Sequence, residues 1–277
     1  MNLINGEYKQ HIDSSDRGFQ YGDGLFETIE ISQGRPLFLD LHLQRLQRGC
    51  LRLAIPCPAL SLLNQEAHEL CRQHVHAVLK IIVTRGIGGR GYRQPEPIQP
   101  TRVLSLHPYP DYPFAYSEQG IQVRFCNTRL GLNPALAGIK HLNRLEQVLA
   151  RAEWQDSAIQ EGIMLDVNDY VVEGTMSNIF YIKSGIFYTP ALLESGVLGI
   201  MRSVIIDLLA ARQIDVIEQK TTKKDLLSAE QVFVCNSIIG IWPVVQIADT
   251  PLSVGENTKQ IQCWLAQLKH ENTGDAL

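Results

Sequence analysis

The 277-residue sequence lacks any run of about 18 apolar residues, and its first residues contain no apolar signal core. These two absences exclude a membrane-spanning helix of ordinary length and lead us to expect a soluble, cytoplasmic protein without a membrane partner. The chain also lacks an excess of basic residues, because 25 Lys and Arg stand against 29 Asp and Glu. A general nucleic-acid binder would normally show a basic stripe, so we do not expect nucleic acid as a partner.

Paired cysteine motifs are absent as well. The six cysteines are scattered and never form a C-x-x-C pair, which is typical of buried apolar fillers in a reducing compartment. The eight histidines show no spacing of a metal cluster, so no metal is expected. The P-loop, the H-E-x-x-H motif and the G-x-S-x-G elbow are also missing from the sequence.

What the chain does contain is an ordinary globular composition, with 45% hydrophobic and 19% charged residues. Apolar residues at four-three-four-three spacing from Leu39 to Leu53 predict an amphipathic helix. Strands are expected around 25–31, 78–84, 101–106, 162–167, 170–172, 178–182 and 232–235. Further helices are expected around 61–74, 142–153, 200–211 and 258–268. The fold class is therefore α+β (α/β).

A proline-rich segment, His107–Pro113, breaks this pattern, because alternating prolines continue neither a helix nor a central strand. We interpret the segment as a linker between two domains. The expected division is a smaller N-terminal α/β domain over residues 1–112 and a larger C-terminal domain over residues 113–277.

One glycine-rich segment, Gly86–Gly91, matches the dinucleotide-binding pattern G-x-G-x-x-G and follows a strand. That pattern binds a pyrophosphate only when a helix follows it, and three prolines forbid that helix here: Pro95, Pro97 and Pro100. We therefore interpret the segment as a loop between two strands. Its arginines could hold an anion, or the loop could be a plain surface hairpin.

Three further positions have an ordinary and a functional interpretation. Lys140 lies two residues after Gly138, at the start of an amphipathic helix. Most lysines at such a position are solvated. Glu173 follows a strand, as a turn carboxylate would. The segment Gly196–Arg202 opens a helix, so its free N–H groups could hold a phosphate or simply be capped by water.

Several segments occur together along nearly the whole chain. They are Ser15–Arg17, Gly22–Gly24, His42–Leu46, Arg85–Tyr92, Ala137–Gln147, Glu173, Gly199–Arg202 and Cys235–Ser237. In combination they resemble the fold-type IV pyridoxal-phosphate enzymes, and most closely the bacterial aminodeoxychorismate lyases. The stretch Gly138–Leu145 is the most specific of these motifs.

The resemblance implies a role for each matching residue. Lys140 matches the lysine that bonds covalently to pyridoxal 5'-phosphate, and Arg45 matches the arginine that binds the cofactor phosphate. Glu173 matches the carboxylate that faces the pyridine nitrogen and keeps it protonated. Further phosphate contacts are implied for the amides of Ile200 and Met201 and for the turn residues Asn236 and Ser237.

The resemblance also implies an activity, namely the conversion of 4-amino-4-deoxychorismate to 4-aminobenzoate and pyruvate in folate biosynthesis. Lys140 would take a proton from the amine-bearing carbon and return it to the departing enolpyruvate. The substrate carries two carboxylates, and the candidate residues for binding it are Thr28, Arg90, Tyr92 and Tyr109. The family further implies a homodimer with the cofactor at the junction of two domains.

Two alternatives stay open. A fold-type IV aminotransferase acting on branched-chain or D-amino acids would use the same cofactor residues. Branched-chain enzymes typically carry Asn-Tyr-Leu after the lysine, whereas this chain has Asn143-Arg144-Leu145, which favours the lyase. The second alternative is an anion-binding module without catalysis, which would leave Lys140 and Glu173 without a shared purpose.

Overall fold

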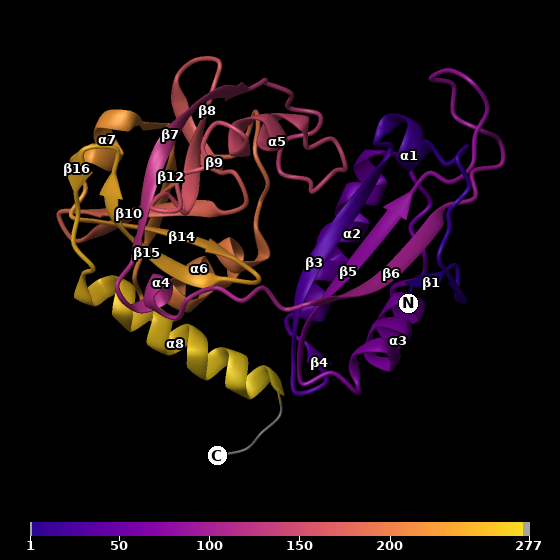
Figure 1. Ribbon diagram of the computed structural model, residues 1–277, viewed down its shortest axis with the longest axis horizontal. Helices are drawn as coiled ribbons and strands as arrows, with labels where there is room; N and C mark the ends of the chain where they lie inside the picture. Colours follow the sequence, from indigo (N-terminus) through magenta and orange to yellow (C-terminus); the bar gives the residue numbers. More distant parts are fainter. Residues whose placement is uncertain (1, 274–277) are drawn as a thin grey trace. The chain divides into compact units, whose positions relative to one another are not determined.

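The computed structural model describes residues 2–273, which form two compact units (Figure 1). Among the described residues, unit 1 contains 2–110, 139–143 and 271–273. Unit 2 contains residues 111–138 and 144–270. Each unit combines a β-sheet with helices, which confirms the expected mixture of α and β structure.

Unit 1 is built on a six-stranded sheet in the order β2-β1-β6-β5-β3-β4, in which all neighbouring strands are antiparallel. The strands are β1 (Asn2–Ile4), β2 (Glu7–Lys9), β3 (Gly24–Ser32), β4 (Arg35–Pro36), β5 (His76–Thr84) and β6 (Thr101–Pro108). The β-branched runs of β3 and β5 place every second side chain in the core, as the alternating pattern predicts. β6 extends through His107 and Pro108, so the expected linker begins inside the sheet.

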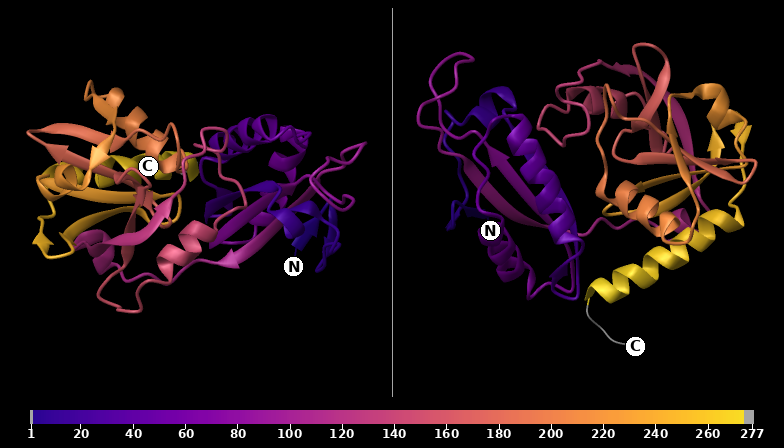
Figure 2. Two further views of the ribbon diagram at one scale, coloured as in Figure 1. Left: turned by 90° about the horizontal axis from the view of Figure 1, so that it is seen from above. Right: turned by 180° about the vertical axis from the view of Figure 1, so that it is seen from behind.

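The helices of unit 1 are α1 (Arg17–Tyr21), α2 (Leu39–Arg52) and α3 (Leu60–Cys71). The right-hand view of Figure 2 shows α2 lying along one face of the sheet. Its buried face contains the residues that the four-three spacing selects, including Leu43, Leu46 and Cys50. They cover the inward-facing Leu25 and Ile29 of β3, and this burial stabilises the unit by roughly 1.5–3 kcal/mol for each large side chain.

Residues 139–143 pack onto the start of β3. The amide of Phe26 donates to the carbonyl of Lys140 over 3.0 Å, and the amide of Leu142 donates to the carbonyl of Gly24 over 2.9 Å. A side chain at Gly24 would meet the Val83 carbonyl at 2.6 Å, so only glycine permits this close approach. The expected division placed Lys140 in the C-terminal part, whereas these contacts group it with unit 1.

Unit 2 contains a larger mixed sheet in the order β12-β11-β10-β14-β15-β7-β8-β9-β13, with β16 paired to β15. Its strands are β7 (Ile121–Leu130), β8 (Glu161–Asp166), β9 (Tyr170–Gly174), β10 (Asn178–Lys183), β11 (Ile186–Pro190), β12 (Val216–Gln219), β13 (Thr221–Thr222), β14 (Gln231–Asn236), β15 (Gly240–Ile247) and β16 (Thr250–Pro251). β7 runs parallel to both β8 and β15, and β11 runs parallel to β12. Fully buried aromatic residues such as Tyr181 fill its core.

The helices of unit 2 are α4 (Ala115–Glu118), α5 (Leu145–Arg151), α6 (Ile200–Ala210), α7 (Lys223–Leu227) and α8 (Glu256–Thr273). The helix expected over 142–153 is shorter at both ends. α5 begins three residues later, because residues 139–143 pair with β3. Leu145 and Leu149 are 76% and 61% exposed.

The segment after Gly86 runs as a loop from β5 directly into the antiparallel β6. This connection confirms the interpretation of the segment as a loop between two strands. Between residues 2 and 273, no helix is long and apolar enough to cross a membrane. All six cysteines are free thiols, and four of them are buried, as expected of apolar fillers.

Candidate active site

A buried charge cluster joins β3 to α2 in unit 1. The Arg45 guanidinium donates from Nε to Oε1 of Glu27 over 2.8 Å and from Nη2 to Oε2 over 2.5 Å. Nδ1 of His42 lies 2.6 Å from Oε2 of the same carboxylate. Because residues 42 and 45 lie one helical turn apart on α2, both side chains reach the single strand residue. The two hydrogen bonds to Glu27 hold the Arg45 guanidinium in one orientation.

The charges in this cluster are set by its burial. Burial alone would raise the pKa of Glu27, but the Arg45 charge and the hydrogen bonds from His42 and Arg45 lower that pKa to about 2. Burial lowers the pKa of His42, and the charges of Arg45 and Lys140 act in the same direction against the opposing effect of Glu27. At neutral pH the cluster therefore holds a carboxylate, a guanidinium and a neutral imidazole.

Lys140 lies beside this cluster. Its Nζ is 4.3 Å from the centroid of the Phe26 ring, and its charge acts on His42. A cation over a ring face is stabilised by the ring quadrupole, which orients the amine without neutralising it. Unit 1 thus brings together two of the residues singled out in the sequence, Lys140 and Arg45, with Glu27 and His42 as their neighbours.

Unit 2 contains the predicted carboxylate Glu173, which is buried on β9. Its Oε2 accepts from the amide of Val197 over 2.8 Å, and its Oε1 accepts from Nε2 of Gln147 over 3.4 Å. Burial lowers the pKa of the neighbouring Arg144, while the charge of Glu173 raises it. The carboxylate is therefore fixed by a backbone amide and by a residue of α5.

The segment before α6 is fixed by Asn178 of β10. Its Oδ1 accepts from the amide of Gly199 over 3.0 Å, and its Nδ2 donates to the carbonyl of Val197 over 2.9 Å. In the structure of residues 2–273, no side chain caps the first turn of α6. The amides of Ile200 and Met201, which the sequence singled out, thus lie at an uncapped helix N-terminus.

Asn236 ends β14, and its side chain closes the following turn. Its Oδ1 accepts from the amides of Ile238 and Ile239 over 2.8 and 2.9 Å, and its Nδ2 donates to the carbonyl of Met176 over 3.0 Å. This arrangement places Ser237 at the turn itself. Asn236 therefore shapes the turn through its side-chain oxygen.

A second network that the sequence did not reveal fixes the loop between β9 and β10. The buried Glu161 carboxylate accepts from the amide of Thr175 over 3.0 Å and from the hydroxyl groups of Thr175 and Ser177 over 2.5 and 2.7 Å. The loop follows Glu173 directly. Glu161 opens β8 and had no signal in the sequence, whereas Glu27 lies between the apolar Leu25 and Ile29 of β3, and this alternation was the available signal.

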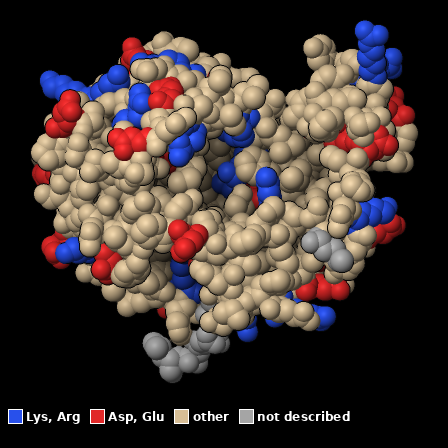
Figure 3. Space-filling view, viewed as in Figure 1, with Lys and Arg blue, Asp and Glu red and all other residues tan. Residues whose placement is uncertain are grey.

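The four candidate substrate residues occupy different parts of unit 1. Thr28 lies in the middle of β3, opposite Lys80 of β5. Arg90 and Tyr92 belong to the exposed β5–β6 loop, where Figure 3 shows basic side chains at its end. This loop is anchored by Arg17, whose Nη1 donates to the carbonyl of Gly91 over 2.9 Å.

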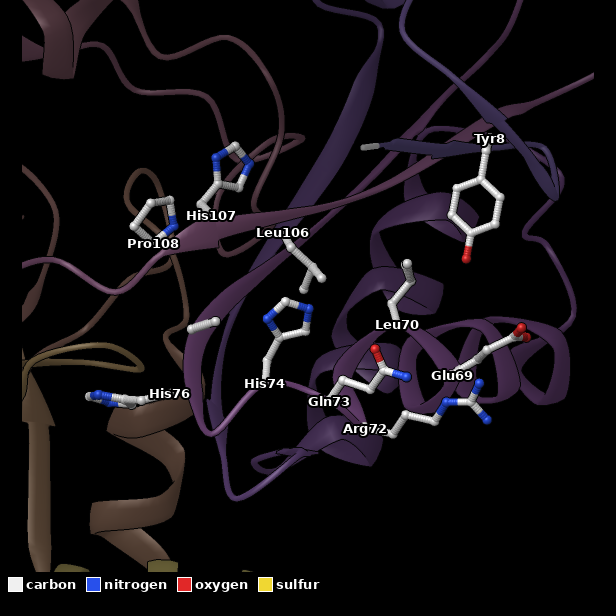
Figure 4. Close-up of a pocket in the computed structure, with 11 residues that line it drawn as sticks. Tyr8, Glu69, Leu70, Arg72, Gln73, His74, His76, Leu106, His107 and Pro108 are labelled. Carbon is white, nitrogen blue, oxygen red and sulfur yellow. The ribbon is translucent and has the colours of Figure 1, made fainter.

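Tyr109 is stacked on His76 with ring centroids 3.6 Å apart. His76 pairs with Ser32 at the opposite end of β3 from Phe26, about 20 Å away along the strand. His76 lines a cavity of about 720 Å³ together with His74, His107 and Arg72 (Figure 4). The structure therefore does not bring Tyr109 close to Lys140 within this chain.

Comparisons with known proteins agree over nearly the whole chain. The family model "Amino-transferase class IV" matches residues 24–247. An aminodeoxychorismate lyase of Vibrio harveyi is 37% identical over 265 residues, covering 94% of this chain and 97% of the relative. A putative branched-chain-amino-acid aminotransferase of Methanocaldococcus jannaschii is 32% identical, with 94% and 93% covered.

Among solved structures, the crystal structure of 4-amino-4-deoxychorismate lyase from Pseudomonas aeruginosa superposes with a TM-score of 0.93. The two sequences are 43% identical, and the match covers 96% of this chain and 98% of that one. This likeness confirms the expected fold class. The chain therefore belongs to the aminotransferase class IV family.

Proposed function

We propose that this protein is a pyridoxal-phosphate-dependent lyase that converts 4-amino-4-deoxychorismate to 4-aminobenzoate and pyruvate, a step of folate biosynthesis. The observation that carries the proposal is the 43% identity, over 96% of the chain, to a lyase structure of TM-score 0.93. The 37% identity to a second lyase supports it independently. The site residues described above supply the chemistry that this reaction needs.

The side chains of unit 1 fit two groups of the cofactor. Lys140 offers a primary amine for the aldehyde carbon, and the ring contact with Phe26 orients that amine. Arg45 offers a permanently charged, planar fork for the phosphate, and Glu27 and α2 fix its direction. Both residues keep the roles that the family resemblance implies.

The residues of unit 2 fit the remaining groups. Glu173 is a buried carboxylate that can hold a proton on the pyridine nitrogen. The uncapped N-terminus of α6 offers the amides of Ile200 and Met201 to the phosphate, and Ser237 offers a hydroxyl at the following turn. Asn236 contributes by shaping that turn. When bound, the cofactor stabilises negative charge on the carbon that carries the substrate amine.

Lys140 then performs the proton transfers. Its neutral amine takes the proton from the amine-bearing carbon, and the same nitrogen returns a proton to the departing enolpyruvate, which becomes pyruvate. The elimination leaves an aromatic ring, so the products are more stable than the substrate. Thr28, Arg90, Tyr92 and Tyr109 stay candidates for the two substrate carboxylates.

We also propose that the two units are the two domains and that the protein is a cytoplasmic homodimer. Three apolar side chains of α5 support a partner copy, because Leu145, Val148 and Leu149 are each at least 60% exposed. A second copy of the chain would bury them. The free thiols are consistent with a reducing compartment.

The test is pyruvate release from 4-amino-4-deoxychorismate by the cofactor-loaded protein, with no keto acid added. We expect release by the wild type and none by Lys140→Ala, which should keep its fold because Lys140 holds residues 139–143 through its backbone carbonyl. Turnover in Lys140→Ala near that of the wild type would overturn the assignment. A loaded wild type that acts only when a keto acid is supplied would instead be an aminotransferase.

A further inference from the structure

The open face of the unit 1 sheet carries a polar row across four strands. Thr28 of β3 lies opposite Lys80 of β5, Lys80 lies opposite Ser105 of β6, and Ser105 lies opposite Asn2 of β1. The next row towards the start of β3 is apolar and consists of Phe26, Ile82, Val103 and Ile4. Polar side chains are ordinary on the open face of an antiparallel sheet, so the row is informative only through its position beside the reacting amine.

Lys80 faces away from the core of unit 1. Its neighbours along β5, Leu79 and Ile81, are completely buried on the face that packs towards α2. Lys80 itself is partly buried. Among residues 2–273, no carboxylate forms an ion pair with it. The acidic residue diagonal to it, Glu30, pairs instead with His76 over 3.7 Å.

The ammonium of Lys80 is close to the reacting amine. Nζ of Lys80 is 5.4 Å from the centroid of the Phe26 ring, and Nζ of Lys140 is 4.3 Å from the same centroid. The two nitrogens are therefore at most about 10 Å apart, so one small ligand can contact both. A ring contact alone leaves the hydrogen-bonding capacity of the Lys80 ammonium unused, since its three N–H donors need acceptors.

We propose that Lys80 binds a carboxylate of the substrate, with the Thr28 hydroxyl beside it as a second donor. This inference rests on the proposed function, because the lyase substrate carries two carboxylates that need cationic partners. A strand position suits this role, since the sheet backbone fixes Lys80 at a set distance from Lys140. A branched-chain amino acid has no second carboxylate, so Lys80 would also favour the lyase substrate over that of an aminotransferase.

The experiment compares wild type with Lys80→Met, which keeps the length of the side chain and removes its charge. We expect KM for 4-amino-4-deoxychorismate to rise about tenfold to a hundredfold, because one charged hydrogen bond is lost. We expect kcat to stay within about threefold of the wild-type value. Lys80→Arg should recover part of the loss. Lys9→Met, an exposed lysine of the same unit, is the matched control and should change neither constant.

Product binding to the holoenzyme, measured by calorimetry, identifies the carboxylate. Weaker binding of 4-aminobenzoate, with unchanged binding of aniline, assigns Lys80 to the ring carboxylate, and weaker binding of pyruvate assigns it to the enolpyruvyl carboxylate. The proposal is overturned if KM and both product affinities of Lys80→Met stay within twofold of wild type, or if only kcat or thermal stability falls. A wild type without pyruvate release would refute the lyase, while Lys80-dependent binding of 4-aminobenzoate would still support the carboxylate site.

Discussion

The substitution Glu27→Gln tests the charge cluster that holds Arg45. In the wild type the ionised carboxylate is surrounded by Arg45 and His42 and is almost completely buried. Its pKa falls from 4.5 to about 2, which corresponds to roughly 3 kcal/mol in favour of the ionised form. Removing one partner of a buried pair costs about 3–5 kcal/mol, because the other charge is left uncompensated. We therefore expect the variant to lose about 3 kcal/mol of stability at pH 7.

The assay is hydrogen exchange of the cofactor-free protein, followed in peptides of β3 and α2, with urea unfolding as a second measure. The double variant Glu27→Leu with Arg45→Met should regain at least half of the loss, since well-packed apolar residues can replace a buried ion pair. Glu7→Gln, an exposed carboxylate of the same unit, should show no measurable change. A Glu27→Gln protein whose free energy of unfolding stays within about 1 kcal/mol of the wild-type value would refute the reasoning.

The pH dependence of this stability has a definite sign. Because the folded-state pKa of Glu27 is lowered, its contribution is fully present above pH 4.5 and is lost as the pH falls towards about 2. Glu27→Gln should therefore show a flatter stability profile than wild type over that window. An unchanged slope between pH 4.5 and 2 would contradict the assignment of this acid sensitivity to Glu27.

Two further substitutions test other parts of the cluster and its frame. The pKa of His42 is lowered below 6.5, so its neutral form stabilises the fold, and this contribution declines as the pH falls below 6.5. His42→Asn should flatten the wild-type decline in Tm just below that pH, and an equally steep decline would contradict the prediction. Gly86→Ala should destabilise unit 1 by about 1–3 kcal/mol from backbone strain alone, because φ is 86°. Its new Cβ would also collide with the Gln99 carbonyl oxygen, so an unchanged urea midpoint would contradict the prediction.

Much of unit 1 could be predicted because its signals are local. The four-three spacing of Leu39, Leu43, Leu46 and Cys50 selects the buried face of α2. The apolar run from Val78 to Thr84 likewise selects the central strand β5. Periodicity is sufficient where an element packs against its own chain.

Other elements depend on contacts that a single sequence does not display. β15 contains Pro243, which pairs with Phe233 in the middle of the strand, and a proline ordinarily argues against a central strand. β7 pairs with β15 only from Val244 onward, so the missing N–H of Pro243 breaks no bond of that ladder. The short strands β1 and β2 are three residues each and carry too few residues for a periodic signal.

The residues of the candidate site also differ in whether the sequence alone identifies them. Lys140, Arg45 and Glu173 were identified by resemblance, since a lone lysine, arginine or glutamate has an ordinary interpretation when taken by itself. Glu27 was missed although it alternates with Leu25 and Ile29 on the buried face of β3, where a carboxylate requires a buried cation. The exposure of Leu149 on α5 could not be predicted, because an apolar stripe does not reveal whether the chain itself or a second copy covers it.

The central claim is that this chain eliminates pyruvate and makes the substrate ring aromatic. The most direct measurement is the amount of 4-aminobenzoate and of pyruvate formed in one reaction without any keto acid, with Lys140→Ala in parallel. The account predicts equal amounts of the two products from the wild type and neither from the variant. Amine transfer that requires a keto acid, with no 4-aminobenzoate formed, would contradict it.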